Sequence, residues 1–266
     1  MRWRVALAHI LIRAGTFVRS LALMVMRPDD LIAFGRQSYS TPRAVESWSA
    51  EGSIEQGLRE EERWLLDRTP VRQGELLLLG VGGGREAIPL AQSGFSVTGV
   101  DFVPEMVERA RRNAACHGIS FKGLVQEISS LAVPADSYAV AWMSSEMYSC
   151  IPTKKRRLAM LARINQALRG DGYFICQFRL HPPLHGAHVC DALRTAVAWL
   201  TLGNLSHENG DGLWGESEFV HAFPSEEAVK SEFSQAGFTV AHFHVPTGSI
   251  RAGAILRKSA SPELAR

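Results

Sequence analysis

The clearest chemical signal in the sequence is a glycine-rich segment followed at a fixed distance by an acidic residue. Gly80, Gly82 and Gly84 alternate with other residues directly after a run of leucines, and Asp101 follows Gly80 by 21 residues. A glycine-rich turn lets backbone N–H groups approach a ligand closely, and a carboxylate at the end of the next strand can accept both hydroxyls of a ribose. The pair therefore predicts a nucleoside-binding site.

An alternation of strands and helices must hold these residues in place. Short continuous apolar runs are typical of buried parallel strands, and Pro104 and Gly118 mark the start and the stop of a helix. Strands are predicted at 74–80, 95–101, 119–127, 137–145 and 172–178, with helices between them at 85–94, 104–118 and 154–170. We therefore expect an α/β fold, with a Rossmann-like sheet covered by helices on both faces.

The spacing of the glycines separates two kinds of nucleoside site. The dinucleotide fingerprint G-x-G-x-x-G would place its last glycine at position 85, where this chain has Arg85. The observed spacing, G-x-G-x-G, resembles motif I of the class I S-adenosylmethionine-dependent methyltransferases, and residues 97–114 resemble their second motif. The resemblance extends over about 74–178 and 216–257. An NAD-dependent oxidoreductase remains the enzymatic alternative, and Arg85 disfavours it.

This resemblance implies a seven-stranded class I methyltransferase sheet and S-adenosylmethionine as the cofactor. Gly80, Gly82 and Gly84 would bring the backbone close to the methionine part of that cofactor, and Asp101 would accept the ribose hydroxyls. The alternative is that the glycines only make a tight turn and that Asp101 caps the following helix. Glu86 is a further expected cofactor contact, near the methionine amino group.

The same resemblance assigns residues to the adenine and to the reacting methyl group. Phe102 and Met106 would lie beside the adenine, Glu127 would meet its amino group, and Ile128 would pack on the ring. Ser144, at the end of the fourth strand, would face the methyl group. Ordinary core positions for Met106 and Ile128, and a solvated strand end for Glu127, are the alternatives.

Two positions depart from the family pattern. The acid that usually precedes the first motif glycine by two residues is Leu78 here, and the fourth strand has Ala139 where an acid is usual. Glu86 or a backbone carbonyl would then have to position the methionine amino group. These departures keep open a protein that binds the cofactor without catalysis.

Residues for catalysis are expected where the fourth and fifth strands end. The sulfonium methyl is already activated, so the enzyme has to align the acceptor and exclude water, and a base is needed only for a protonated, weakly acidic acceptor. Glu146 and Tyr148 follow the fourth strand and His181 follows the fifth, where ligands sit in open α/β sheets. Packing roles are the alternative for each.

The N-terminal segment 5–26 is long enough to suggest a membrane span. Its twelve strongly apolar residues favour insertion by about 4–7 kcal/mol, but Arg13 and Arg19 oppose it by about 5–7 kcal/mol. On a helical wheel, Leu7, Leu11, Val18, Leu21 and Val25 lie opposite a polar wedge made of Arg2, His9, Arg13, Thr16, Ser20 and Arg27. A basic amphipathic helix of this kind favours the surface of an anionic membrane. Packing on the protein body, or covering a ligand site, are the alternatives.

The charge distribution points to the same end of the chain. The first 27 residues carry five arginines and no acid, whereas the whole chain of 266 residues has a net charge of +2, so the remainder carries −3. An acidic body without interleaved basic and aromatic residues makes a nucleic-acid partner unexpected.

The segment 184–215 contains an apolar helical stretch and a Gly/Asn-rich loop, and such insertions often shape an acceptor pocket in this family.

The cysteines argue against a disulfide framework. Cys116, Cys150, Cys176 and Cys190 are scattered and include no C-x-x-C pair, which fits reduced thiols in the cytoplasm. His181, His185 and His188 lie close together, but prolines and glycine interrupt the segment and no further ligand completes a set, so no metal is predicted.

These observations predict an amphipathic helix over 1–30, a helical cap over 31–73, a methyltransferase domain over 74–258 with the insertion at 184–215, and a tail over 259–266. The expected function is methyl transfer from S-adenosylmethionine to a small-molecule acceptor, with a lipid-like acceptor suggested by the N-terminal helix alone. The expected location is the cytoplasm, with peripheral attachment to the inner face of the membrane through residues 2–27. The non-enzymatic alternative is a membrane-recruited protein that only binds the cofactor.

Overall fold

The computed structural model describes residues 2–143, 145–180, 188–215 and 218–259. The chain begins with five helices that precede the sheet. Proline starts two of them, because its missing N–H and fixed φ suit a first helical turn, and the Thr41 side chain caps the third by accepting from the Ala44 N–H. Their bounds are α1 Arg2–Val25, α2 Pro28–Tyr39, α3 Pro42–Ser49, α4 Glu51–Glu55 and α5 Glu60–Arg68.

The centre of the molecule is a sheet whose strands run in the order β3-β2-β1-β4-β5. These five strands are parallel, β9 then pairs antiparallel with β5, and β8 pairs antiparallel with β9. The strands are β1 Gly74–Leu79, β2 Phe95–Asp101, β3 Phe121–Val125, β4 Tyr138–Met143, β5 Leu168–Leu180, β8 Phe238–His244 and β9 Arg251–Lys258. The predicted α/β fold is confirmed. The sheet has nine strands among the described residues instead of the seven expected, because a hairpin adds two to these seven.

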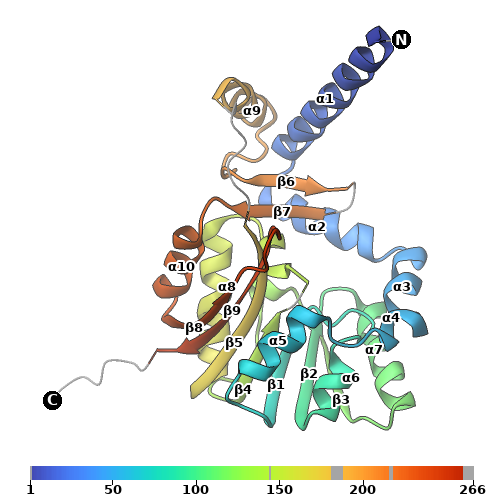
Figure 1. Cartoon of the computed structure of the whole chain (residues 1–266), viewed down its shortest axis with the longest axis vertical. Coiled ribbons are helices and arrows are strands. Elements are labelled where there is room, and N and C mark those ends of the chain that lie inside the picture. Colours follow the sequence, from blue (N-terminus) through green and yellow to red (C-terminus); the bar gives the residue numbers. More distant parts are fainter. Residues whose placement is uncertain (1, 144, 181–187, 216–217, 260–266) are drawn as a thin grey trace, which may run out of the picture.

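A hairpin adds two more strands at the carboxyl end of β5. It consists of β6 Asp211–Trp214 and β7 Glu218–Phe223, which pair antiparallel with each other. β7 also pairs in parallel with the last two residues of β5, Arg179 and Leu180. Figure 1 shows the hairpin lying across the end of the sheet, between the body and helix α1. Part of the predicted Gly/Asn-rich loop in the insertion is therefore strand β6, because its partner β7 satisfies its backbone groups.

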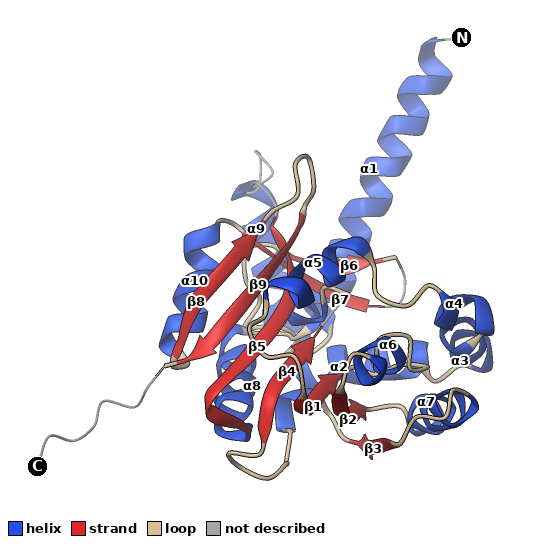
Figure 2. Ribbon diagram, turned by 60° about the horizontal axis from the view of Figure 1, so that its bottom comes forward, coloured by secondary structure: helices blue, strands red, loops and turns tan. Residues whose placement is uncertain are grey.

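Helices cover both faces of the sheet, as Figure 2 shows. On one face, α8 Lys154–Ala167 and α10 Glu226–Gln235 bury a core with the alternate strand residues that include Leu77, Ala141 and Phe174. On the other face, α5, α6 Ala87–Gln92 and α7 Pro104–Cys116 pack on Leu76, Val140 and their neighbours. The short helices η1 Ile128–Ser130 and η2 Met147–Cys150 follow β3 and β4.

Helix α1 extends away from the body in both views, beside α9 His188–Thr201 (Figures 1 and 2). Of its predicted apolar face, Leu7, Leu11, Val18 and Val25 are exposed. Among the α1 residues whose burial is described, Leu23 and Met24 near its end are buried, and they join a small cluster with residues of α2, α9 and β7. The body therefore leaves most of the apolar face of α1 open. By length and composition, Trp3–Val25 could also cross a membrane, and 12% of its most apolar stretch is buried.

Candidate active site

A cavity of about 530 Å³ opens where β1, β2 and β4 end, within the size range of small-molecule sites. Its walls come from helices α2 and α3, from the segments that follow β1, β2, β3 and β4, from the end of β5 and the start of β9, and from the hairpin β6–β7. Nine of the predicted site residues line it: Gly80, Gly82, Glu86, Asp101, Phe102, Met106, Glu127, Ile128 and Glu146. The structure therefore brings together residues that were assigned from separate motifs.

The glycine-rich turn adopts a backbone that suits glycine at each motif position. Gly80, Gly82 and Gly84 have φ values of +76°, +51° and +100°, a region that residues with a Cβ rarely adopt. A Cβ on Gly82 would meet no atom within 4 Å, so its open side faces the cavity. Gly84 does not line the cavity: a Cβ there would lie 3.3 Å from Ala110 Cα of α7, so this glycine allows close helix packing.

Asp101 is bound to that same turn. Its Oδ2 accepts from the Gly82 N–H at 2.9 Å, and its Oδ1 accepts from the Val103 N–H at 3.0 Å. Burial raises the pKa of the carboxyl, although these backbone hydrogen bonds oppose the rise. Each oxygen keeps capacity for a further hydrogen bond, because a carboxylate offers about four acceptor positions. The turn therefore orients an acceptor pair at the cavity wall.

At the predicted adenine end, Glu127 has a local role. Its Oε1 accepts from the Ser129 N–H at 2.8 Å and its Oε2 accepts from the Ser129 hydroxyl at 2.5 Å, which caps η1. Phe102 lies nearby in the wall, with the Arg36 guanidinium 5.4 Å from its ring centroid. Glu127 lines the cavity as well as capping η1. Its carboxylate has acceptor positions left for the predicted contact with the adenine amino group.

A buried charge cluster stands at the predicted methionine end. The Arg85 guanidinium forms two hydrogen bonds of 2.7 Å with Glu62 and also pairs with Glu86. Two carboxylates and one guanidinium give the cluster a net charge of −1. Leu78, in contrast, is fully buried and packs with Val81 on the opposite side of β1 from Leu77. The negative charge that Leu78 cannot provide is therefore present in this cluster.

The residues predicted for catalysis lie in different environments. Glu146 lines the cavity and forms ion pairs with Arg179 and Arg251. It also has a φ of +63°, directly after Ser145 at +55°, and such consecutive strained residues are typical of functional sites. Tyr148 does not line the cavity. Its side chain is fully buried and its hydroxyl donates to Glu232 Oε2 at 2.6 Å, so we assign it a packing role. Ser144 and His181 lie outside the described residues.

Several cavity residues were not predicted from the sequence, among them Tyr39, Glu218 and Arg251. The Tyr39 hydroxyl donates to Glu218 Oε2 at 3.0 Å, and the Arg179 guanidinium lies 3.8 Å from the Trp214 ring centroid. Burial raises the pKa of Glu218. Glu218 begins β7, and nothing in its local sequence indicates that this strand reaches the cavity.

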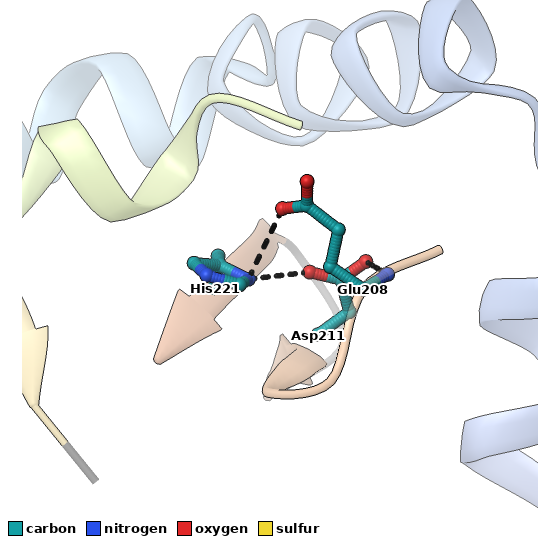
Figure 3. Close-up of side chains that lie close together, drawn as sticks. All are labelled: Glu208, Asp211 and His221. Carbon is teal, nitrogen blue, oxygen red and sulfur yellow. Dashed lines mark hydrogen bonds and ion pairs between the residues drawn. The ribbon is translucent and has the colours of Figure 1, made fainter. Parts of the chain in front are cut away.

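One group among the described residues has the spacing of a metal site. Figure 3 shows Glu208, Asp211 and His221, and the His221 Nδ1 lies 2.7 Å from Asp211 Oδ1 and 3.7 Å from Glu208 Oε2. However, Glu208 Oε2 also lies 2.6 Å from Arg157 Nη2, and its Oε1 accepts from the Lys154 N–H at 2.8 Å. The guanidinium already supplies positive charge to this group, so we assign it to anchoring the hairpin on α8.

Comparisons with known proteins agree with this geometry. A family model described as a methyltransferase domain matches residues 76–172. A demethylmenaquinone methyltransferase from Thermus thermophilus is 27% identical over 178 residues, which are 66% of this chain and 77% of that protein. A 23S rRNA (uracil(1939)-C(5))-methyltransferase from a Shewanella strain is 48% identical over 56 residues, so the match spans only 12% of that protein.

Solved structures show the same architecture. The 1,6-didemethyltoxoflavin-N1-methyltransferase from Burkholderia thailandensis, solved with 1,6-didemethyltoxoflavin and S-adenosylhomocysteine bound, has a TM-score of 0.60 with this chain at 18% identity. The similarity covers 87% of this chain and 90% of that one. The part matched by the family model begins within β1 and includes both Gly80 and Asp101.

Proposed function

Because this chain belongs to the class I S-adenosylmethionine-dependent methyltransferases, we propose that it transfers the cofactor's methyl group to a hydrophobic small molecule in the cavity at the strand ends. The observation that supports this most directly is that the turn of Gly80 and Gly82, the Asp101 carboxylate and an apolar wall share one cavity. When bound, the cofactor supplies a sulfonium-activated methyl group. The chain has to hold, orient and shield the reactants.

The residues that line the cofactor half have the roles that the resemblance implies for them. We propose that Asp101 accepts the ribose hydroxyls, that Phe102, Met106 and Ile128 pack around the adenine, and that Glu127 accepts from its amino group. The glycine turn provides the close backbone approach, and the Glu86 cluster would attract the methionine ammonium by its net negative charge. Ser144 and His181 stay predictions for the methyl end.

The acceptor half of the cavity is mainly apolar. Leu31 and Ile32 of α2, Trp48 of α3 and Phe219 of β7 line it. Burying a side chain-sized apolar group against such walls favours binding by about 1.5–3 kcal/mol. The Thermus thermophilus relative is named for demethylmenaquinone, an apolar acceptor, and this supports the same substrate class here.

We also propose that α1 attaches the protein to an anionic membrane surface. Its exposed apolar residues and its excess of arginine fit a helix that lies in the interface. None of the α1 residues described lines the cavity, which disfavours the alternative of a cover over the site. The buried end of α1, at Leu23 and Met24, contacts the cluster that contains Leu31 and Phe219, two residues of the acceptor wall.

Calorimetric titration with S-adenosylhomocysteine, with NADH in parallel, tests the cofactor assignment. We expect micromolar binding of the former, lost in Asp101→Ala and retained in Glu75→Gln, an exposed control at the opposite end of β1. Binding of NADH instead would contradict the proposal. Binding of S-adenosylhomocysteine without methyl transfer to any acceptor in lipid extracts would favour the binding-only alternative that Leu78 and Ala139 keep open.

A further inference from the structure

Two side chains from distant parts of the chain, Tyr39 and Cys150, lie beside the Glu218 carboxylate in the cavity. Glu218 begins β7, Tyr39 ends α2 and Cys150 ends η2, and all three line the cavity. The Tyr39 hydroxyl donates to Glu218 Oε2 at 3.0 Å. The Cys150 thiol donates to the Glu146 carbonyl oxygen at 3.8 Å, and it lies close enough to the Glu218 carboxylate to lower its pKa. The cavity function described above uses none of these three groups.

The charged groups around Glu218 are already engaged with one another. Arg179 of β5 pairs with Glu146, which also pairs with Arg251 of β9, and the Arg179 guanidinium stacks on Trp214 of β6. Glu218 thus accepts a hydrogen bond from the neutral Tyr39 hydroxyl, and it interacts with Arg179 and Glu146 as nearby charges. A buried carboxylate in this position is a stronger proton acceptor than an exposed one, because burial penalises its charged form.

We propose that Glu218 is the base that receives the proton of a hydroxyl group on an apolar aromatic acceptor, and that Tyr39 orients its carboxylate. The proposal rests on the proposed methyltransferase function. As the acceptor oxygen forms its bond to the methyl carbon and the bond from that carbon to sulfur breaks, the hydroxyl proton passes to Glu218. The products are a methyl ether, neutral S-adenosylhomocysteine and a protonated Glu218, which then loses its proton to water.

Two further observations favour this acceptor class. The bond from Tyr39 to Glu218 is itself a phenol donating to this carboxylate, so the local geometry accommodates an aromatic hydroxyl. The nearby aromatic and aliphatic side chains of Trp214, Phe219 and Ile151 provide faces for a ring. A carboxylate offers about four acceptor positions, and the Tyr39 donor leaves room for a hydroxyl of the acceptor.

The test uses naphthol as the probe and naphthalene as its matched partner without a hydroxyl. The full-length protein is first saturated with S-adenosylhomocysteine, and that binding step tests the proposed function separately and reports correct folding. We expect naphthol to bind more tightly than naphthalene by roughly tenfold to a hundredfold, as one hydrogen bond to a charged group predicts. Glu218→Gln should abolish most of this preference, and the exposed control Glu75→Gln should keep it.

The pH dependence provides a second readout that packing alone would not give. Burial raises the pKa of Glu218. The preference for naphthol should therefore fall as the pH is lowered from about 8, at pH values above those at which an exposed glutamate protonates. The Tyr39 hydrogen bond lowers that pKa, so Tyr39→Phe should move the fall to higher pH. The Glu218→Gln profile should be flat.

Several results would overturn the proposal. They are equal binding of naphthol and naphthalene, no binding of naphthol by the loaded protein, and an unchanged naphthol preference or pH profile in Glu218→Gln. If instead S-adenosylhomocysteine fails to bind the wild-type protein, the proposed function itself is wrong. Methyl transfer from the labelled cofactor to naphthol, reduced by about 10²–10⁴ in Glu218→Gln, would establish the base directly.

Discussion

The two halves of the cavity differ in how the chain builds them. Most of the cofactor half comes from one stretch of sequence, in which the turn after β1 and the end of β2 are bound together through the Gly82 N–H and Asp101. The acceptor half combines α2, α3, η2, the end of β5 and the hairpin β6–β7. The first half is set by local geometry that many sequences of this kind share, whereas the second depends on how distant elements happen to pack.

This difference explains where variation in substrate can arise. A βαβ unit positions its glycine turn and its acid whatever lies on the acceptor side. The hairpin, in contrast, pairs with β5 at two residue pairs, and β7 brings Glu218, Phe219 and Val220 to the cavity. A change in the hairpin would therefore alter the acceptor wall and leave the cofactor wall in place.

The largest expected effect is on the cofactor half. Asp101→Ala removes the acceptor for two backbone N–H groups and for the proposed ribose hydroxyls, so the dissociation constant for S-adenosylhomocysteine should rise by roughly 10²–10⁴. Calorimetry measures it, and circular dichroism checks that the fold is retained. Asp101→Asn keeps the shape of the side chain, so its dissociation constant should lie between those of the wild-type protein and Asp101→Ala. Wild-type affinity in Asp101→Ala would show that the turn binds without its acid.

The next largest effect tests whether α5, which lies outside the β1–β2 stretch, helps to stabilise the cofactor half. Glu62 of α5 precedes Arg85 by 23 residues and is fully buried against it. Glu62→Gln leaves a buried guanidinium with one carboxylate, and breaking such a pair costs about 3–5 kcal/mol of unfolding free energy. Urea denaturation measures the loss, and Glu60→Gln, exposed in the same helix, is the control. A cost below about 1 kcal/mol would mean that Glu86 alone stabilises Arg85.

The limits of prediction from sequence follow the same division. The glycine spacing and the acid after β2 were sufficient to place Gly80, Gly82 and Asp101, because strand–turn–helix geometry links them directly. Glu218 and Tyr39 carry no local signal, since their contact joins positions 179 residues apart. Tyr148 was misleading for a related reason: a loop position at the end of a strand predicts access to the site, but the side chain turns into the core toward Glu232.

A smaller effect is expected at α1, away from both halves. Leu7→Asp combined with Leu11→Asp places charge on the apolar face, and should weaken binding of the full-length protein to anionic liposomes by roughly tenfold to a hundredfold. His9→Asp combined with Ser20→Asp adds the same charge on the predicted polar wedge and is the matched control. Equal losses in the two variants would show that α1 acts through charge alone. Resistance of the wild-type protein to extraction by high salt and alkali would indicate a spanning helix instead.

The smallest expected effect separates the cavity wall from the turn beneath it. A Cβ on Gly83 would lie 2.3 Å from the Trp48 backbone oxygen and 2.5 Å from Ser49 Cα, so Gly83→Ala must displace α3. Forced displacement of this kind costs about 1–3 kcal/mol, and Gly52→Ala, with open space around it, should cost nothing. Because Trp48 lines the cavity while Gly80, Gly82 and Asp101 are untouched, naphthol binding should weaken more than S-adenosylhomocysteine binding. The reverse order would mean that α3 belongs to the cofactor half, and the division between the two halves would have to be redrawn at α3.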